Sequence, residues 1–125
     1  MMSKLYSKEH EWVETLEEGI VRIGISDYAQ QELGDIVFVE IPEVDEEVAA
    51  NESIGTIESV KTVSEIYVPI SGTVVNVNER LEDEPELVNA NPEDEGWLVD
   101  VKMADRDELE DLMNEAEYHA FTEEG

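Results

Sequence analysis

The stretch Ile54-Gly-Thr-Ile-Glu-Ser-Val-Lys-Thr-Val-Ser-Glu-Ile-Tyr-Val-Pro-Ile-Ser-Gly72 predicts a hairpin of two short strands that meet at a tight turn around Lys61. Both arms are rich in β-branched residues, which suit a pleated and half-buried surface. The second arm has the two-residue period of a strand, with one face formed by Ile66, Val68 and Ile70. Pro69 cannot donate a ladder hydrogen bond, so this strand should end or lie at an edge there.

Lys61 is placed at the exposed tip of this hairpin, in a chain with only seven Lys and Arg residues. Most lysines at turns are ordinary surface residues. A lysine on a tight turn is also a suitable attachment point for an acyl cofactor, because its long flexible stem can carry the cofactor between distant sites. We expect Glu58 and Glu65 to help keep the amine charged, so an acylating enzyme must itself deprotonate it.

The length of 125 residues indicates one domain, residues 1–125, and 41% hydrophobic residues are enough for a core. The chain has no cysteine, which excludes disulfides, thiolate metal sites and a cysteine nucleophile. It has no long apolar run and no signal-peptide pattern at residues 1–4. We therefore expect a soluble, cytoplasmic protein with no membrane partner.

The strongest compositional signal is charge, with 34 acidic against 7 basic residues and a formal net charge of -27. A field of this sign repels phosphate backbones, which argues against a nucleic-acid partner, and it favours a monomer. Three interpretations are a disordered acidic tail, a nucleic-acid mimic and adaptation to concentrated salt. Only 17 of the 34 acids lie in residues 81–125, so the excess is not confined to a tail. We favour a halophilic protein, because at about 1 M salt the Debye length of about 3 Å screens acid–acid repulsion.

Further strands and one early helix are predicted around the hairpin. The strands, marked by apolar and β-branched residues, are expected at residues 12–16, 20–25, 35–41, 73–78 and 97–103. Ser26 and Gly34 bound a short helix over residues 27–33. We expect the strand at 35–41 to be mostly buried. The polar segment 79–95 contains two prolines, which favours loops and a short helical turn.

A C-terminal helix is predicted over about residues 105–118. Asp105 and Glu108 resemble a capping box, with Asp as the capping residue. An apolar stripe with the helical period is formed by Leu109, Leu112, Met113, Ala116 and Ala120. We expect it to dock on the sheet, because a membrane-surface helix would carry Lys and Arg on its polar face. With about seven strands and two helices, the pattern predicts a mainly β sandwich or small barrel.

No catalytic constellation is present in the sequence. Gly-rich phosphate loops, a nucleophile elbow and zinc-protease motifs are all absent. The only histidines, His10 and His119, lie at opposite ends of the chain. Clustered acids such as residues 105–111 could bind Ca²⁺ or Mg²⁺ loosely, but no loop has the EF-hand spacing. We therefore predict no catalytic residue, no metal site and no enzymatic activity.

Six stretches, in order, carry a family resemblance: His10–Val13, Gly24–Gln30, Leu33–Val39 with Pro42, Glu58–Lys61, Pro69–Gly72 and Gly96–Leu98. Together they closely resemble the H proteins of the glycine cleavage system, nearly end to end. The block Glu58-Ser-Val-Lys61 is quite specific. A biotin carrier would show Met on both sides of the lysine, and lipoyl domains of 2-oxoacid dehydrogenases usually have an Asp-Lys-Ala turn and lack the terminal helix.

The resemblance implies a barrel-sandwich hybrid fold, lipoyl-domain-like, with lipoate bound covalently to Lys61. It implies a carrier that takes an aminomethyl group from glycine decarboxylase (P protein) to aminomethyltransferase (T protein) and electrons to dihydrolipoamide dehydrogenase (L protein). A lipoate-attaching enzyme is a further implied partner. The resemblance also implies a surface cleft that shelters the loaded arm: Glu11 matches a family position that lines this cleft, and Glu65 lies where the family often has Asp.

The sequence departs from the family pattern at two positions, and one alternative function remains open. Asp45 and Asn51 stand where the family often has Gly, and both residue types tolerate tight turns. The alternative function is an H-like scaffold or lipoate-relay protein without glycine cleavage. The intact block around Lys61 favours the carrier, because a pure scaffold has no need of the lysine.

Overall fold

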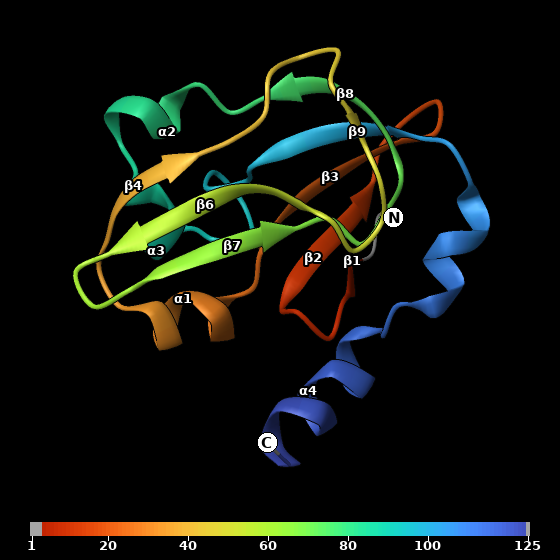
Figure 1. Ribbon diagram of the computed structural model, residues 1–125. Helices are drawn as coiled ribbons and strands as arrows, with labels where there is room; N and C mark the ends of the chain where they lie inside the picture. Colours follow the sequence, from red (N-terminus) through yellow and green to blue (C-terminus); the bar gives the residue numbers. More distant parts are fainter. Residues whose placement is uncertain (1–3, 125) are drawn as a thin grey trace.

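The computed structural model describes residues 4–124 and shows a mainly β protein with two antiparallel sheets (Figure 1). One sheet has the strand order β1-β2-β3-β9-β8-β5 and the other the order β4-β6-β7. The strands are β1 Lys4–Tyr6, β2 Glu11–Thr15, β3 Ile20–Ile25, β4 Ile36–Glu40, β5 Glu47–Val48, β6 Ser53–Ser59, β7 Val63–Tyr67, β8 Gly72–Val77 and β9 Val99–Met103. The helices are α1 Asp27–Leu33, α2 Arg80–Asp83, α3 Leu87–Ala90, the 3₁₀ helix η1 Arg106–Asp111 and α4 Glu115–Glu124.

This architecture confirms the predicted fold class, a barrel-sandwich hybrid with a short early helix and a C-terminal helix. The hairpin of β6 and β7 and the helix α1 lie where the sequence predicts them. Two very short strands, β1 and β5, were not predicted. The expectation of no signal peptide rests partly on Met1 to Ser3, which lie outside the described residues. Within residues 4–124 no helix is long and apolar enough to cross a membrane.

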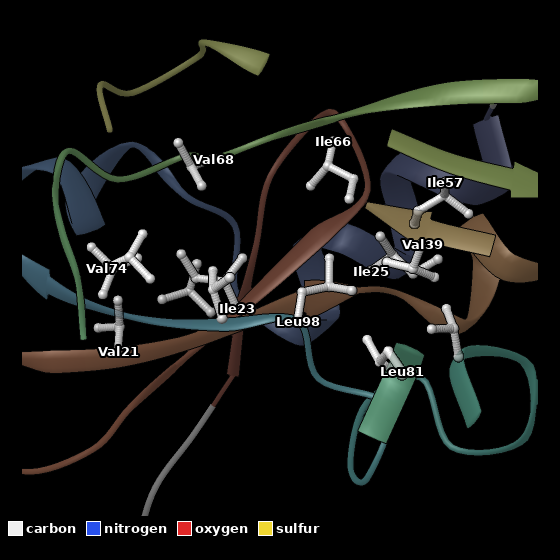
Figure 2. Close-up of a cluster of buried hydrophobic side chains, with 14 of the residues drawn as sticks. Val21, Ile23, Ile25, Val39, Ile57, Ile66, Val68, Val74, Leu81 and Leu98 are labelled. Carbon is white, nitrogen blue, oxygen red and sulfur yellow. The ribbon is translucent and has the colours of Figure 1, made fainter. Parts of the chain in front are cut away.

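The core lies between the two sheets, and both contribute β-branched side chains to it (Figure 2). The six-stranded sheet gives Val21, Ile23, Ile25, Val74, Val99 and Val101, and the three-stranded sheet gives Ile36, Val39, Ile57 and Ile66. Leu81 and Val88 from the short helices α2 and α3 close one side. Fully burying one such side chain contributes about 1.5–3 kcal/mol, so this layer is the main source of stability.

The strand β4 departs from the prediction of a mostly buried strand at residues 35–41. Its burial alternates irregularly, and Val37 and Phe38 are exposed. The pairing of β4 with β6 is interrupted by a register shift between Ile36 and Phe38. The three-stranded antiparallel sheet meets the core with one face, so the other face of β4 is exposed. An uninterrupted apolar run in the sequence cannot distinguish this arrangement from a fully buried strand.

The single C-terminal helix predicted for residues 105–118 is wrong, because the segment forms two helices with a break at Leu112 to Asn114. Asp105 does cap the first of them, accepting a hydrogen bond from the Asp107 backbone N–H at 2.9 Å. Glu108 does not complete a capping box. Its carboxylate instead accepts hydrogen bonds from the backbone N–H and the hydroxyl of Ser71, at 2.7 and 2.9 Å.

The helix α4 begins with its own capping box and docks through aromatic residues. Asn114 Oδ1 accepts from the Glu117 backbone N–H at 2.8 Å, and Glu117 Oε1 accepts from the Asn114 backbone N–H at 2.9 Å. Because the segment forms two helices, the residues of the predicted apolar stripe do not share one helix face. Its two alanines, Ala116 and Ala120, are exposed. The docking residues are Tyr118 and Phe121, which pack in a cluster with Tyr6 and Trp12.

Trp12 in this cluster needs a glycine opposite it. Trp12 and Gly24 are paired across β2 and β3, and a Cβ atom added to Gly24 would lie 2.8 Å from the indole ring. The indole N–H donates to the Pro92 carbonyl at 2.8 Å. Asp45 and Asn51 take the left-handed conformation with φ of 78° and 71°, so these departures from glycine fit the fold.

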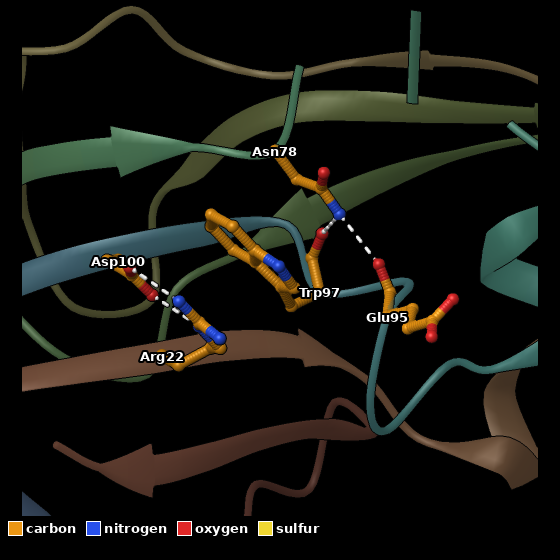
Figure 3. A network of polar contacts seen from close by, with 5 residues as sticks. All are labelled: Arg22, Asn78, Glu95, Trp97 and Asp100. Atoms are coloured by element: carbon orange, nitrogen blue, oxygen red, sulfur yellow. Dashed lines mark hydrogen bonds and ion pairs between the residues drawn. The ribbon is translucent and has the colours of Figure 1, made fainter. Parts of the chain in front are cut away.

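The outer face of the six-stranded sheet carries a polar network on neighbouring strands (Figure 3). Arg22 donates two hydrogen bonds to the buried carboxylate of Asp100, at 2.8 and 3.1 Å, and its guanidinium lies 4.1 Å from the Trp97 ring centroid. The side-chain amide of Asn78 donates to the carbonyls of Glu95 and Trp97. These contacts fix the start of β9 against β3 and β8.

Candidate functional site

The turn between β6 and β7 is shaped by the hydroxyl of Ser59. Its Oγ accepts hydrogen bonds from the backbone N–H groups of Lys61 and Thr62, at 3.2 and 3.1 Å. The Ser59 backbone N–H donates to the Thr62 carbonyl at 2.8 Å, which closes the turn. A serine that bonds to the backbone two and three residues later is a common turn device. Ser59 therefore holds the Lys61 backbone in a defined conformation at the tip.

The tip is also tied to the end of α1. The Val60 backbone N–H donates to the Asp35 carbonyl at 3.0 Å. The Lys61 stem passes over Gly34, where an added Cβ would lie 3.1 Å from Lys61 Cε. Lys61 is exposed, and none of the ion pairs found within residues 4–124 involves it. Glu58 and Glu65, which were expected to help keep the amine charged, thus form no ion pair with Lys61.

A cleft of about 310 Å³ opens between α1 and the β6–β7 hairpin. Its walls come from the segment before β2, from α1 and from the hairpin, and its lining residues are Glu9, His10, Glu11, Ile25, Tyr28, Ala29, Glu32, Leu33, Ile57, Ser64, Glu65 and Ile66. The structure thus brings the two predicted cleft residues, Glu11 and Glu65, into one cavity. Lys61 is not part of the lining, but it lies against Gly34, the residue that follows Leu33 of the cleft wall.

Glu11 is the most unusual side chain of the cleft, because it is a carboxyl group only 3% exposed. Its pKa is raised to about 8: burial is the main cause and the nearby Glu9 adds to it, whereas hydrogen bonds from Ser7 and the Tyr67 backbone oppose the shift. The Ser7 hydroxyl donates to Glu11 Oε1 at 2.7 Å. Without a cation beside it, most Glu11 side chains therefore hold a proton at neutral pH.

The wall formed by the segment before β2 is held to α1 and α4 by an aromatic and hydroxyl network. His10 takes a left-handed backbone conformation with φ of 69°, and its Nδ1 forms a 2.7 Å hydrogen bond with the Tyr118 hydroxyl. That hydroxyl also bonds to Ser26 Oγ at 2.6 Å. The His10 ring packs against Tyr28 with centroids 4.7 Å apart. Burial lowers the pKa of His10, which favours the neutral ring.

Glu65 stands at the exposed rim of the cleft and is differently placed from Glu11. It accepts a 2.8 Å hydrogen bond from the Tyr67 hydroxyl, which raises the pKa of Tyr67. The cleft thus offers one buried and several exposed carboxyl groups beside apolar walls. Such an arrangement can accept a small cationic group and shelter it from water. Within residues 4–124 no group of three or more His, Asp or Glu side chains is placed to hold a metal ion.

Sequence reasoning missed several residues of this site. Ser59 carried a usable signal, because a serine just before a predicted tight turn is typical of such hydrogen bonding. The cleft residues Tyr28 and Glu32 carried none, since their position depends on how α1 packs beside the hairpin. The tie between His10 and Tyr118 joins residues 108 positions apart, so it could not be predicted from either one.

Comparison with known proteins gives consistent matches over nearly the whole chain. The family model of the glycine cleavage H-protein matches residues 4–125. The glycine cleavage system H protein of Geobacillus kaustophilus is 60% identical over 120 residues, which are 96% of this chain and 94% of that protein. The corresponding protein of Staphylococcus carnosus is 56% identical over 113 residues, covering 90% and 89%.

A solved structure agrees with these sequence matches. The crystal structure of a glycine cleavage system H protein from Mycobacterium marinum is similar with a TM-score of 0.89 and 37% sequence identity, covering 97% of each chain. The likeness therefore includes both sheets and the helices that frame the cleft. On these matches of sequence and structure, the chain belongs to the glycine cleavage H-protein family.

Proposed function

We propose that this chain is the lipoyl-carrying shuttle protein of the glycine cleavage system, with lipoate bound through an amide to Lys61 Nζ. The observation that carries the proposal is the placement of Lys61, which a turn fixed by Ser59 holds exposed at the hairpin tip. A rigid base with a long flexible stem is what a swinging carrier needs. The chain acts as a carrier and not as an enzyme.

The residues beside Lys61 fit this cofactor. When bound, the lipoyl group supplies a disulfide that accepts the aminomethyl carbon and two electrons. The cleft of about 310 Å³ begins next to the Lys61 stem and lies at the lower end of the volumes of small-molecule sites. Glu11 and Glu65 line it, and their carboxylates would pair with an ammonium group. A cation there would draw the Glu11 pKa down from about 8, so binding would release a proton.

The proposed partners follow from this role. They are the glycine decarboxylase that supplies the aminomethyl group, the aminomethyltransferase that accepts it, the dihydrolipoamide dehydrogenase that takes the electrons, and the enzyme that attaches lipoate. Family membership supports these partners, and the exposed hairpin tip gives them a common point of access.

The test is the intact mass of the chain purified from its own cells, with peptide mapping across residues 54–67. We expect a mass increment of one lipoyl amide on Lys61, and no increment in Lys61→Arg, which keeps the positive charge. An unmodified Lys61 in cells that grow on glycine would overturn the carrier role and favour the scaffold alternative. A lipoyl group on another lysine would show that the hairpin tip is not the attachment site.

We further propose that the acidic surface adapts the chain to concentrated salt. The relatives described above give no independent support for this, so the proposal rests on the charge of -27 and its spread along the chain. Salt screens repulsion among exposed acids, so we expect the melting temperature to rise by about 5 °C or more between 0.1 M and 2 M KCl. A melting temperature that does not change with KCl would contradict this proposal.

A further inference from the structure

The side chain of Asn89, on the short helix α3, binds the loop between α1 and β4 at both of its ends. Its Oδ1 accepts a hydrogen bond from the Ile36 backbone N–H at 2.8 Å. Its Nδ2 donates to the Gly34 carbonyl and to Gln30 Oε1, both at 2.9 Å. An amide oxygen must face an N–H and an NH₂ group must face an oxygen, so these partners determine the orientation of the amide. Asn89 therefore fixes both ends of the segment 34–36.

This segment faces the hairpin tip, residues 59–61, residue by residue. The facing pairs are Ile36 with Ser59, Asp35 with Val60 and Gly34 with Lys61. The middle pair is a backbone hydrogen bond of 3.0 Å from the Val60 N–H to the Asp35 carbonyl. The three contacts extend the antiparallel pairing of β4 with β6 as far as the lysine. The base of Lys61 is therefore held by whatever fixes residues 34–36.

Core packing does little to fix the first part of this segment. Gly34 has a φ of 82° and no side chain, so its backbone has wide conformational freedom. Asp35 is exposed, and none of the seven described residues of α1 is buried. By contrast, α3 is anchored in the core by Leu87 and Val88. The amide of Asn89 thus links an anchored helix to a loop that is otherwise weakly held.

We propose that Asn89 is a positioning residue for the lipoyl arm, which holds the base of Lys61 at the edge of the cleft. The inference rests on the carrier function proposed above and adds a residue that acts through the backbone without touching the arm. The cleft lies between α1 and the hairpin, and the contact of 34–36 with 59–61 joins these two walls where the Lys61 stem begins. Through Gln30, Asn89 ties the same contact to α1.

The experiment measures ¹⁵N relaxation order parameters of the backbone in the apo chain, for wild type and Asn89→Ala. For Val60 and Lys61 we expect about 0.85 in wild type, the value of rigid backbone, and less than about 0.6 in the variant. The Leu98 N–H, which bonds to β3, should stay rigid in both. Asn89→Asp keeps the acceptor for the Ile36 N–H but loses both donors, and it serves if Asn89→Ala does not fold.

Asn78→Ala is the matched control, because it also removes a side-chain amide that donates to two backbone carbonyls, at 2.8 Å each. Asn78 lies beside β9, away from the tip, so its loss should lower stability without changing the order parameters of Val60 and Lys61. A tip that stays rigid in Asn89→Ala, or is already flexible in wild type, would overturn the inference. An equal loss of order in Asn78→Ala would also overturn it, because the tip would then respond to any loss of stability.

A second measurement connects the tip to the sheltering of the arm. Lipoylated chain is loaded with the aminomethyl group, and the release of ammonia into water is followed without the aminomethyltransferase. A mobile base should lower the share of time that the arm spends in the cleft, so we expect release from Asn89→Ala to be about fivefold faster than from wild type or Asn78→Ala. Equal release rates would overturn the link to the cleft. If wild-type chain carries no lipoate, the carrier function itself fails, whereas the order parameters of the apo chain still decide whether Asn89 holds the tip.

Discussion

Two buried carboxyl groups on opposite faces of the six-stranded sheet have very different surroundings. Asp100, 2% exposed, receives two hydrogen bonds from Arg22, whose guanidinium also stacks on Trp97. Glu11, 3% exposed, has no basic side chain beside it within the described residues and takes its hydrogen bonds from a serine hydroxyl and a backbone N–H. Asp100 is fully neutralised by the fold, whereas Glu11 has room for a cation.

The contrast separates a structural acid from a binding acid. A buried carboxylate is costly unless it is paired, so the Arg22–Asp100 pair needs no function beyond holding β3 and β9 together. Burial of Glu11 without a cation raises its pKa, a state that proteins retain chiefly at functional sites. In a chain with 34 acids, composition alone cannot make this distinction, and the local environment does.

The largest expected effect on stability comes from breaking the Arg22–Asp100 ion pair. Arg22→Ala leaves Asp100 buried without a partner, so we expect the free energy of unfolding to fall by about 3 kcal/mol. Denaturant unfolding at pH 7 measures it. Arg80→Ala is the control, because Arg80 makes only exposed ion pairs with Glu84 and Glu95, and it should cost less than about 1 kcal/mol. Equal losses in the two variants would show that the Asp100 pair is no different from a surface pair.

For Glu11, which has no cationic partner, the expected change in the free energy of unfolding has the opposite sign. Below pH 4.5 both folded and unfolded chains hold the Glu11 proton, but between pH 4.5 and about 8 only the folded chain does. Wild-type stability therefore falls over this range relative to Glu11→Gln, by at most about 1.4 kcal/mol per pH unit. At pH 7 this difference amounts to about 3 kcal/mol in favour of the variant.

The measurement is a set of urea unfolding curves for wild type and Glu11→Gln between pH 4 and pH 9. The control is Ala120→Gly, at an exposed α4 residue without a polar side chain, whose difference from wild type should not vary with pH. A Glu11→Gln difference that is also constant with pH would show that Glu11 ionises as an ordinary exposed acid. The cleft would then contain no buried carboxyl group with a raised pKa.

Local signals made the hairpin and α1 predictable from the sequence. Ser26 and Gly34 cap α1 through contacts within a few residues, and both act as predicted. The C-terminal segment was mispredicted because a distant partner decides it: Glu108 turns to Ser71 instead of the Asp105 backbone. The burial of Glu11 was equally hidden, since it depends on contacts with segments distant in sequence, among them β7, where the Tyr67 backbone bonds to its carboxyl group.

A smaller effect is expected where neutral hydrogen bonds hold the cleft wall. Tyr118→Phe removes the hydroxyl that bonds to both His10 and Ser26, and should lower the free energy of unfolding by about 1 kcal/mol. Tyr28→Phe is the control, because the Tyr28 hydroxyl bonds to an exposed Glu32 and should cost less. Urea unfolding at pH 7 compares them. A loss as large as that of Arg22→Ala would show that these neutral hydrogen bonds stabilise the fold as strongly as the buried ion pair.

The smallest effect probes what sets the Glu11 pKa. Burial is the main cause and Glu9 a lesser one, so Glu9→Gln should lower the Glu11 pKa by only a fraction of a unit. Carboxyl NMR titration of Glu11 measures this directly. Glu14→Gln removes the same charge from a residue that is not among those raising the Glu11 pKa, and should leave it unchanged. Equal shifts in both variants would show that the net charge of the chain acts on Glu11, because a local effect must depend on which acid is removed.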